Sequence, residues 1–203
     1  MGYYIRVLST SADCIPLSVL QSTLEVDSLR ATLVLDAGEP DDWTQLILSH
    51  DDDDGRQIAS IVRDLVEEGS LGSAELADFA DEIADSKPDS AVRWLLEYFP
   101  RVRCIYAFQL LSGTDYKNGW DILDVIENRI RSAAPSIGQA DNEGFRNEDD
   151  YHILWQFSDS VEGDWPMGVL QEGRWGYFQM DLGNRKQREV FLRGQIPDDA
   201  KRL

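Results

Sequence analysis

One loop of this chain gathers side chains that could carry out acid–base or metal chemistry. Between Ala140 and His152 the sequence holds carboxylates, carboxamides, an arginine and one of its two histidines. Imidazole and carboxylate groups are common metal ligands and common general acids and bases. The candidate catalytic set is therefore His152 with Asp150 and Glu148. No second His or Cys lies near His152 at a ligand spacing, so the competing interpretation is a structural turn whose Asp and Asn side chains bind backbone amides.

The residues after this loop predict where the imidazole lies. A strand from Tyr151 to Phe157 would place His152 on its less buried face and Trp155 on the opposite, buried face. We expect His152 to be partly exposed and hydrogen-bonded to loop groups such as Asp150. We expect no set of metal ligands to converge on it.

A run of four aspartates is the second candidate site. It does not fit a calcium-binding EF-hand, because with Gly55 as the sixth loop position the first ligand would be His50 and the twelfth Ile61. Charge runs are usually exposed, so a solvated hairpin tip is the simpler interpretation. In the alternative interpretation the run binds a partner through Asp51, Asp52, Asp53 and Asp54.

Other signatures of catalysis are missing from the sequence. It contains no P-loop, no dinucleotide-binding glycine turn, no Gly-x-Ser-x-Gly elbow, no HExxH and no paired CxxC. Cys14 and Cys104 are too few and too far apart to indicate a disulfide framework or a zinc site, and we expect both to be reduced structural thiols. We therefore expect neither a cofactor nor a metal.

The net charge of −19 is the strongest feature of the composition. Residues 1–100 hold 6 Lys/Arg against 21 Asp/Glu, whereas residues 101–203 hold 13 against 17. Such a field repels nucleic acid and anionic membranes and attracts cationic partners. The alternative is that acidity serves only solubility. Because no apolar run approaches the roughly 20 residues that cross a bilayer, and no targeting segment is recognisable, we expect a cytoplasmic protein.

Hydrophobic periodicity predicts an α+β protein. Strands are expected at residues 3–9, 31–35, 43–49, 57–66, 104–112, 151–157, 165–171 and 175–181, and helices at 15–24, 73–83, 88–99, 119–133 and 185–193. The spacing of apolar residues in 57–66 also fits a helix, and its resemblance to 165–171, which contains Pro and Gly, favours the strand. Short turns join most of these strands, which indicates mainly antiparallel pairing with helices on one face of the sheet.

Two stretches 108 positions apart resemble each other and predict an internal duplication. Asp41–Ser49 aligns with Asp149–Phe157, and upstream Tyr4–Ser9 aligns with Ala107–Ser112. We expect two βαβββ units, at 1–72 and 101–203, with a helical pair inserted at 73–100. If the units are equivalent, residues 3–66 and 104–171 superpose, and Trp43 and Tyr151 occupy equivalent strands.

The leading functional hypothesis is an acidic binding protein that is not an enzyme and engages a cationic protein partner. Its most concrete form is an immunity- or inhibitor-type protein against a basic toxin, and an acidic decoy for a nucleic-acid-binding protein is a variant. A hydrolase or metal-dependent enzyme centred on His152 is the alternative, and a structural subunit is a third reading. The sequence leaves the oligomeric state open.

Overall fold

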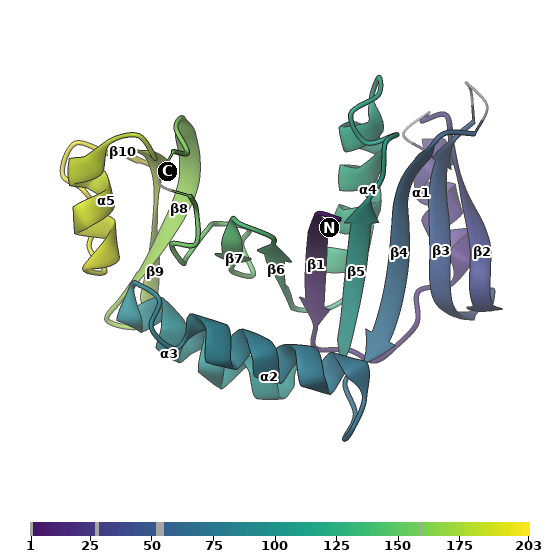
Figure 1. The fold of residues 1–203 in the computed structure, drawn as a ribbon, viewed down its shortest axis with the longest axis horizontal. Coiled ribbons are helices and arrows are strands. Elements are labelled where there is room, and N and C mark those ends of the chain that lie inside the picture. Colours follow the sequence, from purple (N-terminus) through teal and green to yellow (C-terminus); the bar gives the residue numbers. More distant parts are fainter. Residues whose placement is uncertain (1, 27–28, 52–54, 159) are drawn as a thin grey trace. The chain divides into compact units, whose positions relative to one another are not determined.

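The computed structural model describes residues 2–26, 29–51, 55–158 and 160–203, which form an α+β structure (Figure 1). The chain divides into two compact units, each built from two separate segments. The first unit comprises residues 1–73 and 102–136, and the second comprises residues 74–101 and 137–203. The sequence-based division at residues 72 and 100 was sequential, whereas these units interleave along the chain. No helix among the described residues is both long and apolar enough to cross a membrane.

The first unit is an antiparallel sheet with two helices. Its strands lie in the order β2-β3-β4-β5-β1. Their bounds are β1 Tyr4–Ser9, β2 Ala31–Glu39, β3 Asp42–His50, β4 Gln57–Leu65 and β5 Cys104–Leu110, and the helices are α1 Leu17–Val26 and α4 Gly119–Arg131.

Both helices of this unit cover one face of its sheet. Helix α1 packs against α4 and against β2 (Figure 1). Apolar side chains recur on the covered faces, so the core forms between the helices and the sheet. Fully buried core residues include Leu8, Leu20, Leu24, Leu46, Leu48, Phe108, Ile122 and Ile126. The antiparallel α+β arrangement predicted from the sequence is confirmed here.

The second unit contains three helices, a short hairpin and a three-stranded antiparallel sheet in the order β10-β9-β8. The helices are α2 Leu71–Ile83, whose first residues belong to the other unit, α3 Asp89–Tyr98 and α5 Arg185–Leu192, and a 3-10 turn, η1, spans Phe99–Arg101. The strands are β6 Ser136–Ala140, β7 Gly144–Arg146, β8 Asp164–Gln171, β9 Arg174–Asp181 and β10 Lys201–Arg202. Phe178, Met180 and Phe191 lie at the centre of its core.

The internal duplication is not confirmed. Trp43 lies in β3, whereas Tyr151 lies in no strand, and between Tyr151 and Phe157 only His152 forms isolated bridges. Backbone groups of this segment bond to several different elements and not to one continuous neighbouring strand: His152 bonds to β8, Ile153 to β7, and the Trp155 amide to the Lys87 carbonyl at 2.9 Å. The strand expected at 151–157 is therefore wrong, because alternation in sequence does not supply a partner strand. The strand expected at 57–66 is confirmed as β4.

Candidate functional site

His152 is buried, contrary to the sequence-based expectation. The residue is only 4% exposed. Its ring contacts the ring of Trp165 edge-on, with the two centroids 4.9 Å apart. The His152 amide donates to the Pro166 carbonyl, and its own carbonyl accepts from the Gly168 amide, so the residue is fixed beside β8. Nδ1 has no hydrogen-bond partner among the described residues. Trp155, expected to be buried, is only partly so.

This environment makes His152 a poor base. Burial, and secondly the charge of Arg146, lower the pKa of the imidazole to about 3, against a smaller opposing effect of the Glu143 backbone. A general base works best when its pKa lies near the working pH. Near neutral pH the His152 ring is neutral and accepts protons weakly, which does not favour the enzyme hypothesis.

The carboxylates expected to assist His152 pair with arginines. Asp150 lies 3.0 Å from Arg146, and Glu148 lies 3.7 Å from Arg101. Among the described residues no group of three or more His, Cys, Asp or Glu side chains is arranged to hold a metal ion. The loop therefore does not assemble the catalytic constellation of His152, Asp150 and Glu148.

Asn147 organises this loop as a structural turn. It is 1% exposed, and its Oδ1 accepts from the amides of Asp149 and Tyr151 at 3.2 and 3.0 Å. Its Nδ2 donates to the Tyr177 hydroxyl, which in turn donates to Asp149. Burial and the bond to Asp149 raise the pKa of Tyr177 to about 12. The competing interpretation, in which polar side chains satisfy loop amides, describes Asn147 correctly.

Burial of His152 predicts a loss of stability in acid. The folded pKa of about 3 lies below the value of about 6.5 in an unfolded chain, so the unfolded state binds a proton first as the pH falls. The stability that the neutral ring contributes is present above about pH 6.5 and declines between that pH and about pH 3.

We therefore expect the wild type to lose about 2 kcal/mol more than His152→Leu when urea denaturation is compared at about pH 7 and about pH 5. Parallel losses in the two proteins would show that His152 is not held neutral by burial.

The four-aspartate run lies mostly outside the described residues. Asp51, which is described and exposed, accepts a hydrogen bond from the Thr32 hydroxyl, and its amide donates to the Arg30 carbonyl. Asp52, Asp53 and Asp54 fall in the gap in the description. Partner binding by this run remains a prediction.

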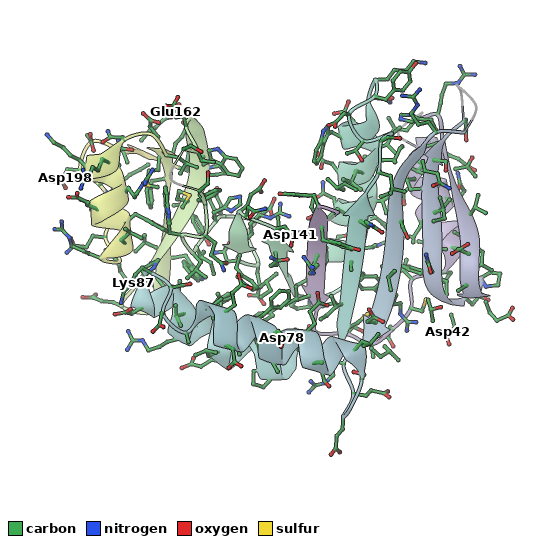
Figure 2. The ribbon with its side chains drawn as sticks, viewed as in Figure 1. Asp42, Asp78, Lys87, Asp141, Glu162 and Asp198 are labelled. Carbon is green, nitrogen blue, oxygen red and sulfur yellow. The ribbon has the colours of Figure 1, made fainter. Side chains whose placement is uncertain are left out.

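A second acidic group lies at the start of β3, at the end opposite Asp51. Asp36, Glu39, Asp41 and Asp42 are all exposed at the end of the β2–β3 hairpin. Asp42 is labelled in Figure 2. We name these four residues the acidic hairpin end. Only Asp42 has an ion-pair partner among the described residues, Arg63 at 2.9 Å.

Buried polar contacts hold the acidic hairpin end in one conformation. Arg63 is 6% exposed and donates to the carbonyls of Ala12 and Trp43 at 2.9 and 3.3 Å as well as to Asp42. Trp43 is fully buried and donates from Nε1 to the Ile15 carbonyl at 2.8 Å. The carboxylates are therefore carried on a braced turn whose conformation does not have to be ordered when a partner binds.

Gly38 allows this turn to close. Its φ is +90°, and a Cβ there would lie 2.7 Å from the Asp42 carbonyl oxygen. Residues other than glycine rarely adopt this φ, and the backbone contact leaves no room for a side chain. Gly38 and Pro40 stand among four carboxylates, a composition that is typical of an acidic turn. This composition does not reveal that Arg63 reaches the same turn from β4.

The acidity is shared evenly by the two structural units. Over the full sequence, the first unit holds 8 Lys/Arg against 18 Asp/Glu and the second holds 11 against 20, giving net charges of −10 and −9. The contrast between the halves of the sequence arises because acidic α2 and α3 precede residue 101 but group with the C-terminal segment. What distinguishes the acidic hairpin end is therefore its local arrangement and not the total charge of its unit.

The second unit also has shallow hollows. One of about 450 Å³ lies beside the start of α3 and is lined in part by Lys87, Ser90, Arg93 and Arg193. Its described lining contains no histidine or cysteine and a single carboxylate, Asp89.

Comparison of the chain with protein-family models, with curated proteins and with solved structures finds no match in any of the three.

Proposed function

We propose that this chain is a binding protein rather than an enzyme, and that it engages a cationic protein partner in the manner of an immunity or inhibitor protein. The observation that carries the proposal is the acidic hairpin end, where exposed carboxylates stand on a turn braced by Arg63 and Trp43. A preformed charged surface of this kind binds a complementary partner without the entropy cost of ordering a flexible loop.

The charge of the whole chain supports the same proposal. A net charge of −19 repels anionic ligands and accelerates encounter with a basic protein, and this effect weakens as salt screens the charges. Asp36, Glu39 and Asp41 supply local carboxylates that no described cation neutralises. Under this proposal the general field speeds association, and the acidic hairpin end fixes where the partner binds.

The aspartate run can contribute to the same surface or act separately. Asp51, the described member of the run, follows β3 directly, whereas Asp41 and Asp42 lie at the start of that strand. Asp51 and the acidic hairpin end therefore lie at opposite ends of one strand of nine residues. A strand of that length spans about 30 Å, so a small partner would engage one group at a time.

The test is titration of the purified chain with the product of the reading frame that adjoins its gene. Replacing Asp36, Glu39 and Asp41 by Asn, Gln and Asn removes three charges without touching the bonded Asp42. We expect the dissociation constant to rise at least about tenfold, since each lost charge contact contributes on the order of 0.5 kcal/mol or more.

A matched control removes the same charge from α2. Asp78, which is labelled in Figure 2, Asp81 and Asp85 are exposed carboxylates on or just after that helix. Their replacement by Asn gives the same change in net charge. We expect only a modest effect, through slower association at low salt. Equal effects of the two triple variants would show that the acidic hairpin end has no special role, and the absence of any binding would remove support for the proposed function.

A further inference from the structure

Strand β2 forms the edge of the first unit's sheet, and only β3 pairs with it among the described strands. The Asp51 amide bonds to the Arg30 carbonyl, and the register pairs Thr32 with Ser49 and Val34 with Ile47. In an antiparallel ladder the bonded residues alternate. The backbone groups of the residues between them, at Ala31, Leu33 and Leu35, therefore point away from β3.

A side chain from α1 already occupies the first part of this edge. Gln21 accepts from the Leu33 amide at 2.8 Å through Oε1 and donates to the Ala31 carbonyl at 3.2 Å through Nε2. Its carboxamide thus makes the two bonds that a neighbouring strand would make. These two bonds also confirm that the backbone groups of Ala31 and Leu33 point away from β3.

The edge beyond Gln21 carries no such cover among the described residues. By the alternation of the ladder the Leu35 amide and carbonyl point away from β3, and no described group outside the strands bonds to them. Neighbouring Val34 is 53% exposed. The strand then bulges between Leu35 and Ala37 and runs directly into the acidic hairpin end. An open stretch of backbone donors and acceptors accordingly lies next to unpaired carboxylates.

We propose that the edge of β2 around Leu35 accepts an extended, basic segment of the partner as an additional strand. This inference rests on the proposed function and specifies how the partner would dock. Backbone hydrogen bonds to Leu35 would supply affinity, and basic side chains on alternate positions would face Asp36 on the exposed side of the sheet. Opposite charges placed across neighbouring strands stabilise their pairing.

The same charges select against the wrong occupant. An open edge strand invites a second copy of the same chain, and charged side chains and bulges are common means of preventing this. A second copy of β2 would bring Asp36 and Glu39 against their equivalents or against other carboxylates of an acidic protein, which is unfavourable. A cationic strand meets no such repulsion, so the edge is closed to self-association and open to the proposed partner.

The test uses a fluorescent peptide of about ten residues that alternates arginine and valine. Leu35→Pro removes the outward-facing amide, and proline is tolerated on an edge strand where its nitrogen faces solvent. Leu35→Ala is the matched control, because it loses the same side chain but keeps the amide. We expect Leu35→Ala to bind the peptide like the wild type and Leu35→Pro to bind at least about tenfold more weakly, as measured by fluorescence anisotropy.

A second peptide keeps the test decisive if Leu35→Pro fails to fold. Proline in place of every valine preserves the charge but removes half of the amide donors and disfavours β structure. We expect the wild type to bind this peptide at least about tenfold more weakly than the first. Equal binding of both peptides, or equal binding by the Leu35 variants, would overturn strand addition. If the peptides bind equally but bind more weakly to the Asp36, Glu39 and Asp41 triple variant, the proposed function is retained and only strand addition is rejected. If neither peptide binds, both the proposed function and strand addition are rejected.

Discussion

Replacing Trp43 by alanine is expected to lower the free energy of unfolding by about 4 kcal/mol. The side chain is fully buried, its ring lies 5.8 Å from that of Tyr106, and its Nε1 donates to the Ile15 carbonyl. The substitution removes a large apolar surface, leaves a cavity and leaves the Ile15 carbonyl without its donor. Urea denaturation followed by circular dichroism measures the change.

Trp120 provides the control for this substitution. It lies in the same unit, is 44% exposed and donates from Nε1 to Asp115 at 3.2 Å. Because most of the cost of losing a tryptophan comes from buried surface, we expect Trp120→Ala to cost less than about 1 kcal/mol. Similar losses for the two variants would contradict the placement of Trp43 in the core beneath the acidic hairpin end.

Replacing Arg63 by alanine is expected to cost about 3 kcal/mol of stability. The loss comes mainly from the carbonyls of Ala12 and Trp43, which would lose charge-assisted donors in a buried site. The ion pair with Asp42 contributes less, because the Asp42 side chain is 78% exposed and water screens its charge.

Asp42→Asn separates these two contributions. It removes the charge of the exposed partner but leaves the buried carbonyl contacts of Arg63 in place. We expect a cost below about 1 kcal/mol, measured by the same denaturation experiment. Equal losses in Asp42→Asn and Arg63→Ala would mean that the ion pair, and not the bonds to the buried carbonyls, stabilises the turn.

Several elements of the fold could be predicted from local sequence. Alternating apolar residues identified β3, and helical spacing of apolar residues identified α4, which runs from Gly119 to Arg131. The strands expected at 165–171 and 175–181 are also confirmed, as β8 and β9, which pair antiparallel across a short turn. Each of these signals depends on neighbours within one element or across one turn.

The candidate site was harder to predict, since its residues are far apart in the sequence. Arg63 lies 21 positions from Asp42 and 51 positions from Ala12, yet it bonds to both. The resemblance of residues 41–49 to 149–157 suggested equivalent strands, but the bonds of Asn147 to its loop and of His152 to β8 give the second stretch a different path. Similar side chains in similar order do not specify the strands with which a segment pairs.

The sequence by itself determined the acidity of this protein, its α+β class and the positions of most helices and strands, because charge and periodicity are local properties of the chain. Only the tertiary structure decided that His152 is buried and that Arg63 braces the acidic hairpin end. It also decided that β2 is an edge strand and that Gln21 covers just part of it. These properties depend on contacts between segments that are distant in the sequence, and such contacts are determined by the packing of the whole core.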